Sequence, residues 1–231
     1  MTKSIILLSG GVDSVVSLAS TLEKENVKLA LFFNYGQKSF EQEKEAVLKI
    51  TEYYNLNLEI IELPWLKKIT TTSLVNSDMD VPELKSDRLD DLDAASESCS
   101  KVWVPNRNGV FVSVSAAYAD SFDFDKIIIG ANKEEGKTFK DNSLEFINKT
   151  NEHLAYSTRV MPKVIAPLID LDKFEIMELG KKLNVPFQYI RSCYNNTQRH
   201  CGKCESCERL KRGLERAGLF DILDMLFECK E

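Results

Sequence analysis

The fold of this chain is decided by the stretch Ser9-Gly10-Gly11-Val12-Asp13-Ser14, which directly follows the apolar run Ile5-Ile6-Leu7-Leu8. A short, continuous aliphatic run at residues 4–8 is typical of a strand that is buried on both faces of a parallel sheet. Apolar residues then recur with helical spacing from Val15 onward. The stretch therefore predicts a strand, a tight glycine turn and the start of a helix.

The glycine turn is suited to bind a phosphate group. Glycine has no Cβ, so backbone N–H groups can approach an anion closely, and a helix N-terminus adds its positive dipole end. Neither a Gly-Lys-Ser/Thr after the turn nor the G-x-G-x-x-G spacing of dinucleotide-binding folds is present. Asp13 repels a bare phosphate, so its presence favours Mg²⁺ held between its carboxylate and a polyphosphate. The alternative interpretation is an ordinary helix cap after a Gly-Gly turn.

Length and charge limit the classes of protein. The 231 residues, 43% of them apolar, are enough to bury one core, so we expect a single domain over residues 1–231. A net charge of −6 argues against nucleic acid as a partner, because phosphate-dominated binding needs a concentrated basic face. The sequence shows no membrane-length apolar run and no signal-peptide pattern, so we expect a cytoplasmic protein without a membrane partner.

Strand and helix patterns alternate along the chain. Further buried-strand patterns fall at residues 27–33, 56–63, 127–129 and 164–166, and a charged amphipathic helix is predicted over residues 37–54. This alternation predicts an α/β fold with a doubly wound, parallel, five-stranded sheet. In such sheets ligands bind beyond the carboxyl ends of the strands, so the loops there form the candidate site. Residues 64–101 lack a regular pattern and predict a long, solvated acidic loop.

Several polar residues fall on the loops at this edge of the sheet. Asn34 and Tyr35 are candidates for contacts with adenosine, and Arg107 with Asn108 suits a phosphate or a purine edge. Residues 132–143 form a polar loop with the donors, acceptors and aromatic side chain that hold a heterocycle. Lys173, at the start of a predicted helix, is placed to contact ATP phosphates. Each of these residues also has an ordinary interpretation as a turn, a helix cap or an exposed side chain.

Four of the six cysteines form a C-x7-C-x2-C-x2-C array of Cys193, Cys201, Cys204 and Cys207. Four thiolates match a closed tetrahedral site for structural zinc, which orders a segment that has little apolar material of its own. We therefore expect residues 188–231 to form a zinc-binding appendage. An iron–sulfur cluster is the alternative, because the same spacing suits that ligation, and His200 offers a substitute ligand. Cys99 and Cys229 are left over and are expected to be inert, with a nucleophilic Cys99 as the alternative.

Together these motifs resemble a known family. The Ser9–Ser14 stretch is similar to the pyrophosphate loop of N-type ATP pyrophosphatases, the PP-loop superfamily. With Asn34-Tyr35-Gly36-Gln37, residues 104–108, Pro167-Leu168 and the cysteine array, the chain resembles 7-cyano-7-deazaguanine synthases over residues 4–217. The resemblance implies a zinc-bearing PP-loop fold, a homodimer and an ATP-dependent ligase reaction. In that reaction the carboxylate of 7-carboxy-7-deazaguanine is adenylated, ammonia displaces AMP to form an amide, and a second activation dehydrates the amide to the nitrile.

The resemblance also implies roles for individual residues. The implied catalytic residues are Asp13, Ser14 and Lys173. The implied ATP-binding residues are Leu8, Ser9, Gly10, Gly11, Val12, Asp13, Ser14, Asn34 and Tyr35. The expected substrate-binding residues are Arg107, Asn108, Glu134, Phe139 and Asp141. We expect Phe139 to stack on the deazapurine and Asp141 or Glu134 to accept hydrogen bonds from its amino and ring N–H groups, because guanine-like edges present adjacent donors.

The chain differs from the family pattern at two places, and two other functions are alternatives. Asn34 stands where the commoner bacterial enzymes have Asp, and residues 138–143 replace their Ser-Gly-Tyr-Pro-Asp-Cys-Arg-like loop, which bears on substrate contacts more than on ATP chemistry. A PP-loop tRNA-modifying enzyme, of thiolase or lysidine synthetase type, shares the phosphate loop. Such an enzyme is expected to carry a basic RNA-binding extension. The net negative charge of this chain argues against one. A nucleotide sensor without turnover is the non-enzymatic alternative.

Overall fold

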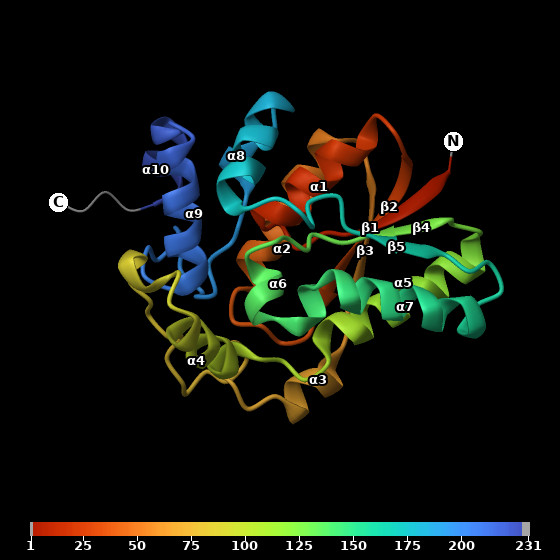
Figure 1. The fold of residues 1–231 in the computed structure, drawn as a ribbon, viewed down its shortest axis with the longest axis horizontal. Coiled ribbons are helices and arrows are strands. Elements are labelled where there is room, and N and C mark those ends of the chain that lie inside the picture. The colour runs from red at the N-terminus through yellow and green to blue at the C-terminus, as the bar shows by residue number, and fades with distance from the viewer. Residues whose placement is uncertain (1, 228–231) are drawn as a thin grey trace.

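The computed structural model describes residues 2–227, and within them a parallel five-stranded sheet carries helices on both faces (Figure 1). In chain order the strands are β1 (Lys3–Leu7), β2 (Asn26–Asn34), β3 (Asn57–Glu62), β4 (Lys126–Ile128) and β5 (Lys163–Ile165). Their spatial order is β3-β2-β1-β4-β5, and every neighbouring pair is parallel. The prediction of a doubly wound parallel five-stranded sheet is confirmed.

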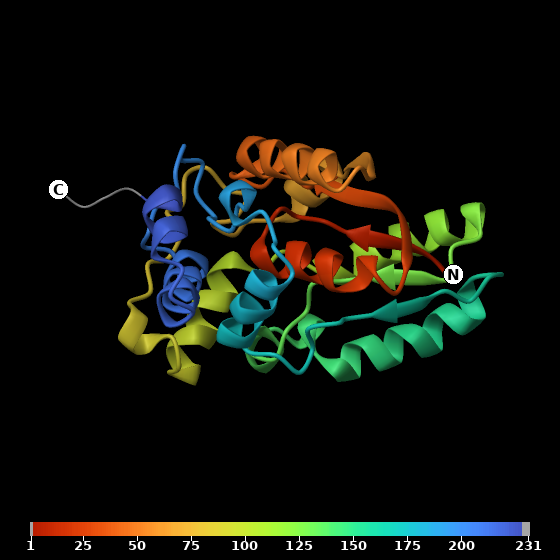
Figure 2. The ribbon, with the colours of Figure 1, turned by 90° about the horizontal axis from the view of Figure 1, so that it is seen from above.

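The direction of strand order reverses at β1. The chain first builds outward from β1 to β3 and then returns to add β4 on the other side of β1. This reversal opens a crevice beyond the carboxyl ends of β1 and β4, where doubly wound folds bind ligands. The N-terminus lies at the opposite end of the strands, far from the C-terminal helices in both views (Figures 1 and 2).

Helices and 3₁₀ turns fill the connections between the strands. The α-helices of the described residues are α1 (Val12–Leu22), α2 (Phe40–Tyr53), α3 (Pro64–Ile69), α4 (Leu92–Val102), α5 (Arg107–Phe122), α6 (Glu135–Thr138), α7 (Leu144–Ser157), α8 (Lys173–Lys182), α9 (Glu205–Arg216) and α10 (Phe220–Leu226). The 3₁₀ turns are η1 (Ser86–Arg88), η2 (Lys140–Asn142) and η3 (Phe187–Tyr189). None of the helices in this part of the chain is long and apolar enough to cross a membrane.

The two faces of the sheet bury separate cores because side chains alternate along each strand. In β1, Ile6 faces the core that includes the apolar sides of α1, α2 and α8, whereas Ile5 faces the core that includes α5 and α7. Both residues are fully buried, as the continuous aliphatic pattern predicted. The crevice at the carboxyl ends therefore rests on a strand that packing fixes from both sides.

The prediction of an irregular loop over residues 64–101 is wrong at both ends. Pro64 occupies the first turn of α3, where its missing N–H costs no hydrogen bond. The Asp91 side chain caps α4 by accepting from the backbone N–H groups of Asp93 and Ala94. A proline at the start of α3 and a side-chain cap at the start of α4 thus begin these helices without a long apolar stripe. The polar loop at residues 132–143 likewise contains α6 and η2.

The C-terminal segment continues the main core. Cys193, Cys204 and Leu210 are buried in the same cluster as Ile6 of the central strand. A boundary at residue 188 stays a prediction, and residues 228–231 of the predicted appendage, with Cys229, lie outside the described residues. α9 and α10 lie beyond the carboxyl ends of the strands (Figure 1).

Candidate active site

The phosphate loop, residues 9–14, connects β1 to α1 at the crevice. Gly10 has a φ of +79°, which favours glycine, and a Cβ there would lie 3.0 Å from the Ala46 side chain. Gly130 follows β4, and a Cβ on it would lie 2.8 Å from the backbone nitrogen of Ser14. The Ser14 hydroxyl closes the turn by donating to a carbonyl oxygen of the loop at 2.8 Å. The glycines that follow β1 and β4 thus allow close backbone packing, Gly10 against α2 and Gly130 against the N-terminus of α1.

Lys173, at the first position of α8, forms an ion pair with Asp13 of the phosphate loop. Its Nζ donates to Oδ1 and Oδ2 of Asp13 at 2.8 and 2.7 Å, and Glu135 Oε1 lies 3.5 Å from the same nitrogen. A capping box formed by Asp172 and Glu175 fixes the start of α8. Although 160 residues separate them, the two predicted catalytic side chains therefore meet in a defined geometry.

The ion pair is nearly removed from water, with side-chain exposures of 7% for Lys173 and 17% for Asp13. Burial raises the pKa of Asp13 to about 6, even though the Lys173 ammonium lowers it and Glu135 raises it further. Burial lowers the pKa of Lys173, but the carboxylates of Asp13 and Glu135 raise it more, so the net shift is upward. Lys173 therefore stays charged, and Asp13 titrates closer to neutrality than an ordinary aspartate.

A cavity of about 230 Å³ opens over the phosphate loop. Its wall combines the carboxyl ends of β1, β2 and β4 with the start of α5 and residues 191–194. The predicted site residues that line it are Leu8, Ser9, Gly11, Asp13, Ser14, Tyr35, Arg107 and Asn108. Most of the predicted ATP-binding residues thus share one concave surface, and its walls come from segments far apart in the sequence.

Three of the predicted ATP-binding residues do not line this cavity: Gly10, Val12 and Asn34. Gly10 shapes the loop, and the Val12 side chain is buried in the core. Asn34 Nδ2 donates to Glu62 Oε2 at 2.8 Å, and its Oδ1 accepts from the backbone N–H of Gly36 at 3.1 Å. The side chain of Asn34 therefore ties β2 to β3 at the edge of the crevice.

Arg107 brings a guanidinium without a carboxylate partner into the cavity. Its Nη1 donates to the Tyr35 hydroxyl at 3.4 Å, and it forms no ion pair within 4.0 Å with any described carboxylate. The pKa of Arg107 is shifted upward because Tyr35 and Asp141 outweigh the effect of burial, which alone would lower it. A half-buried guanidinium without an ion-pair partner is suited to bind an anionic ligand group.

A second, smaller cavity of about 40 Å³ adjoins the first. The two share Arg107 and Tyr194 among their lining residues. The rings of Trp103 and Phe139 in its wall are nearly parallel, at an interplanar angle of 11°, with centroids 6.4 Å apart. Asp141 also lines this cavity; its Oδ1 is buried without a hydrogen bond, and burial raises its pKa. The wall thus offers aromatic faces and one unsatisfied acceptor.

Glu134 lies outside both cavities. Its Oε1 accepts from the backbone N–H of Lys173 at 2.9 Å, and its Oε2 accepts from Arg209 Nη1 at 3.0 Å. Arg209, on α9, also donates to Glu205 Oε1 at 3.0 and 3.1 Å. The carboxylate of Glu134 therefore connects α9 to the backbone of Lys173 and faces neither cavity.

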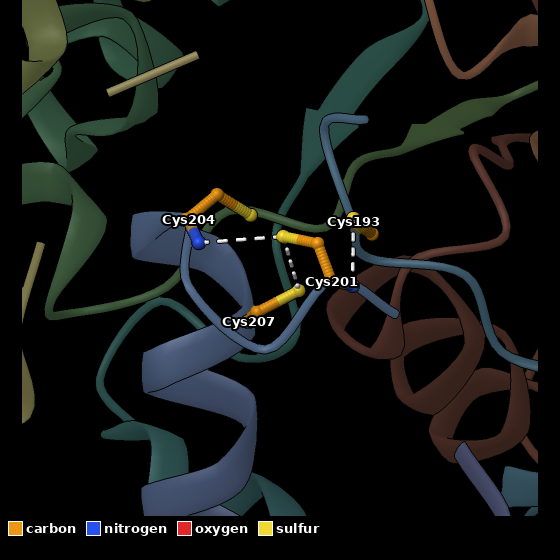
Figure 3. Close-up of side chains that lie close together, drawn as sticks. All are labelled: Cys193, Cys201, Cys204 and Cys207. Atoms are coloured by element: carbon orange, nitrogen blue, oxygen red, sulfur yellow. Dashed lines mark hydrogen bonds between the residues drawn. The ribbon is translucent and has the colours of Figure 1, made fainter. Parts of the chain in front are cut away.

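The four clustered cysteines bring their sulfur atoms together (Figure 3). All four Sγ atoms lie within 4.8 Å of one another, and those of Cys201 and Cys207 are 3.8 Å apart. Four sulfurs bonded to one zinc at about 2.3 Å are separated by about 3.8 Å in a tetrahedron. Backbone N–H groups of Cys201 and Cys204 donate to the sulfurs of Cys193 and Cys201 at 3.4 Å. The donor set therefore fits a closed four-thiolate metal site.

The remaining candidate ligands and thiols are separate from this cluster. His200 Nε2 accepts from the backbone N–H of Ser192 at 3.0 Å, so His200 supports the loop and leaves the metal site to the cysteines. Cys99 is buried on α4, and burial raises the pKa of its thiol to about 11. A thiol with that pKa is a poor nucleophile at neutral pH, in line with the expectation that Cys99 is inert.

The cysteine loop also contacts the phosphate loop directly. The backbone N–H of Arg191 donates to the carbonyl oxygen of Gly10 at 2.8 Å, and the Ser192 hydroxyl accepts from the Val12 N–H at 3.4 Å. Both residues immediately precede Cys193, the first of the four ligands. The segment that leads into the candidate metal site therefore supports the phosphate loop.

The cavity wall also contains residues that were not predicted as site residues, among them Glu43, Arg191 and Ser192. Arg191 and Ser192 adjoin a predicted metal ligand, and that adjacency is the sequence signal for them. Glu43 stands in the first turn of the helix after the Asn34–Gln37 loop. The only local sequence signal for its place in the cavity is its spacing of six residues from Gln37, to which it is hydrogen-bonded. The spacing alone gives no reason to expect their contact.

Comparison with known proteins gives consistent matches. The family described as "Queuosine biosynthesis protein QueC" matches residues 3–218. A 7-cyano-7-deazaguanine synthase of Carboxydothermus hydrogenoformans is 49% identical over 92% of this chain and 98% of its own length. The enzymes of the same name from Pelotomaculum thermopropionicum and Methanosarcina barkeri are 45% and 40% identical, over 94% and 96% of this chain and 98% and 97% of their own lengths. On this evidence the chain belongs to the queuosine biosynthesis protein QueC family, that of the 7-cyano-7-deazaguanine synthases.

Proposed function

We propose that this chain converts 7-carboxy-7-deazaguanine, ammonia and ATP into 7-cyano-7-deazaguanine, and that it is a carbon–nitrogen ligase. The name shared by its relatives supports the product. The observation that carries the proposal is the pair of adjoining cavities, one over a phosphate loop and one with aromatic faces and an unpaired acceptor. Because Arg107 belongs to both walls, an anionic group that it binds lies between the two ligands.

In the first half of the proposed reaction, a carboxylate oxygen of the substrate attacks the α-phosphorus of ATP and pyrophosphate leaves. The carboxylate needs this activation because it has no good leaving group of its own. The phosphate-loop N–H groups and Lys173 stabilise the charge on the phosphates, while Arg107 orients the attacking carboxylate. Ammonia then displaces AMP, and a second round of activation on the amide oxygen leads to the nitrile.

The smaller cavity is the proposed site of the deazaguanine ring. Trp103 and Phe139 supply apolar faces, and the free Oδ1 of Asp141 accepts from the amino and ring N–H groups of the base. An adenine-like edge lacks this pair of donors, so binding it leaves the buried acceptor unpaired at a cost of about 1–3 kcal/mol. That cost provides discrimination between the two purine types.

Two metals have proposed places in this chain. The carboxylates of Asp13 and Glu135 offer hard oxygen donors beside the phosphate loop, which suit Mg²⁺, and the ion would add charge stabilisation on the polyphosphate. Zinc is the proposed occupant of the four-cysteine site, with a structural role. The resemblance of the sequence also supports a homodimer located in the cytoplasm. Light scattering on the purified protein tests the oligomeric state.

The direct test is incubation of the purified chain with ATP, ammonium and 7-carboxy-7-deazaguanine, followed by mass spectrometry. We expect the nitrile, with two AMP and two pyrophosphate released for each molecule formed, because both activation steps cleave ATP at the α-phosphorus. With α-labelled ATP, label recovered only in ADP would contradict attack at that position. A thiolated or lysine-modified tRNA product would favour the tRNA-modifying class instead.

The base subsite has its own test in Asp141→Asn. We expect the KM for the deazaguanine acid to rise by roughly ten- to a hundredfold, because the replacement amide presents a donor to the donors of the base. The KM for ATP should change by less than about threefold and serves as the internal control. Equal effects on both substrates would assign Asp141 to the stability of the loop.

A further inference from the structure

Glu43 is the carboxylate of the larger cavity that has no cationic partner among the described residues. The other two carboxylates in this wall, Asp13 and Glu135, both pair with Lys173. Glu43 accepts instead from neutral donors: its Oε1 from the Ser39 hydroxyl at 2.6 Å and its Oε2 from Gln37 Nε2 at 2.9 Å. A carboxylate has lone pairs for further hydrogen bonds, so Glu43 remains an acceptor toward the cavity.

Gln37 holds Glu43 rigidly against the end of β2. The Gln37 side chain is buried at 4% exposure, and its Nε2 also donates to the carbonyl oxygen of Phe33 at 2.9 Å. Its Oε1 accepts from the backbone N–H of Tyr35 at 3.0 Å. The backbone of Glu43 packs on the phosphate loop, because a Cβ on Gly10 would lie 3.4 Å from its carbonyl oxygen. The carboxylate therefore has a fixed position in the cavity wall that also contains the phosphate loop.

The surroundings of Glu43 make its carboxylate more basic. Burial raises its pKa, and the hydrogen bonds from Ser39 and Gln37 and the charges of Arg107 on α5 and Arg191 before the cysteine loop only partly oppose the shift. Tyr35 also faces it, and its own pKa is raised to about 12, mainly by burial. A carboxylate whose pKa moves toward neutrality can accept and release protons during turnover.

The reaction proposed above requires such a group, and the inference rests on that proposed function. When ammonium becomes an amide, a carbon–nitrogen bond forms, the bond from carbon to the AMP oxygen breaks, and two protons leave the nitrogen. When the amide becomes a nitrile, its oxygen is adenylated, AMP leaves with that oxygen, and two more protons leave the same nitrogen. Every proton of the incoming ammonium must therefore be removed at one place.

We propose that Glu43 accepts the protons released from the substrate nitrogen in amide and nitrile formation and passes each to solvent before the next transfer. Asp13 and Glu135 are held by Lys173, and Asp141 lines the smaller cavity, which leaves Glu43 as the free acceptor of the main cavity. Glu43 acts in the steps that consume ammonia and has no part in the first adenylation of the carboxylate.

The experiment separates these steps in Glu43→Gln. Without ammonia, exchange of labelled pyrophosphate into ATP that depends on the deazaguanine acid measures the first adenylation. With ammonium, mass spectrometry measures amide and nitrile. With hydroxylamine, which is uncharged at neutral pH, hydroxamate formation measures attack by a nucleophile that needs less help with proton removal. Glu45→Gln is the matched control, because Glu45 lies on the same helix, exposed and paired with Lys49.

We expect exchange in Glu43→Gln to stay within about threefold of the wild type, while formation of amide and nitrile falls by about 10²–10⁴-fold. Hydroxamate formation should stay close to the wild-type rate, and Glu45→Gln should match the wild type throughout. Parallel loss of exchange would overturn the inference by assigning Glu43 to the nucleotide or its metal. Unchanged amide formation would overturn it as well.

Two controls keep the result clear. If Glu43→Gln does not fold, Glu43→Asp keeps the charge but withdraws the carboxylate, and it should slow the ammonia-dependent steps with exchange preserved; equal loss of both would overturn the inference. A wild-type chain that shows neither exchange nor nitrile would contradict the proposed function itself. A wild type that makes nitrile beside a fully active Glu43→Gln would contradict the role of Glu43 alone.

Discussion

At the residue scale, the ion pair of Asp13 and Lys173 decides how the cavity responds to pH. The pKa of Asp13 in the folded chain, about 6, lies above its ordinary value of 3.8, chiefly because of burial. The folded state therefore binds more protons than the unfolded state between those values. The contribution of Asp13 to the free energy of unfolding is greatest below about pH 4 and decreases as the pH rises through 6. The proposed contact of Asp13 with Mg²⁺ requires the charged form, so on this proposal stability and activity respond to pH in opposite directions.

We predict that binding of MgATP weakens by about tenfold for each pH unit below 6, because protonated Asp13 offers no charge to the metal. Calorimetric titration with MgATP between pH 5 and 7.5 measures the effect. Asp13→Asn should bind more weakly at neutral pH and lose this dependence on pH. A wild-type affinity that is constant over the range would show that Asp13 does not contact the metal.

Arg107 supports a second prediction at this scale. Its guanidinium has no carboxylate partner, so we expect Arg107→Lys to raise the KM for the deazaguanine acid by about ten- to a hundredfold, as the two-pronged contact with a carboxylate is lost. Steady-state kinetics with each substrate varied in turn measure it. The exposed Arg88→Lys on η1 provides the control. A larger effect on ATP than on the acid would assign Arg107 to the phosphates.

At the element scale, α9 links the metal site to the cavity. Cys204 and Cys207 stand at its start, and Arg209, one turn further, holds Glu134, which in turn accepts from the backbone of Lys173. One helix thus carries two metal ligands and the side chain that positions the lysine. The sequence shows the ligands by their spacing but not the arginine, because its partner is 75 residues away.

We predict that Arg209→Met lowers the free energy of unfolding by about 3–5 kcal/mol, because it leaves the buried carboxylate of Glu205 without its cation and leaves Glu134 with only Arg212, whose Nη2 lies 3.5 Å away. Lys49→Met, on α2, removes a pair whose partner Glu45 is 66% exposed, and should cost about 1 kcal/mol or less. Denaturant titrations of both variants measure the difference. Similar values for the two would show that burial does not decide the energetics of this network.

Zinc gives the second prediction for this element. We expect one zinc per chain by elemental analysis and a colourless protein, whereas visible absorbance and bound iron would show a cluster. Cys204→Ser should lower Tm by about 6–12 °C, if the lost ligand costs about 3 kcal/mol. Exchange of pyrophosphate should fall in the same variant, because Arg191 and Ser192 hold the phosphate loop. Cys99→Ser, away from the cluster, is the control.

At the scale of the whole molecule, the larger cavity joins the phosphate loop, the start of α5 and the segment before the cysteine ligands. A ligand that fills it connects all three. We predict that MgATP slows amide hydrogen exchange in residues 9–14, 107–112 and 191–194 together, with little change in α7, which lines neither cavity. Protection confined to the phosphate loop would show that the C-terminal wall does not take part in binding.

The sequence predicts the structure correctly where the signals are local. Aliphatic runs located all five strands, the glycine hexapeptide located the turn at α1, and cysteine spacing located the metal site. Short helices with only a cap, such as α4, were missed. The environment of Glu134 depends on Arg209 and Lys173, which the fold brings together and no spacing along the chain reveals. Glu43 bonds to the nearby Ser39 and Gln37, but its packing against Gly10 of the phosphate loop is likewise a contact of the folded chain.

The contact between the Val12 N–H and the Ser192 hydroxyl joins residues that are 180 positions apart. The nucleotide site therefore cannot be complete until both residues have been synthesised. At about 5–20 residues per second, the ribosome needs on the order of 10–40 s to reach the second partner after making the first. The phosphate loop leaves the ribosome early but lacks the contacts of Arg191 and Ser192 until the cysteine segment has emerged. If the four cysteines bind zinc as proposed, newly made chains in zinc-starved cells would accumulate with the nucleotide site synthesised but not folded.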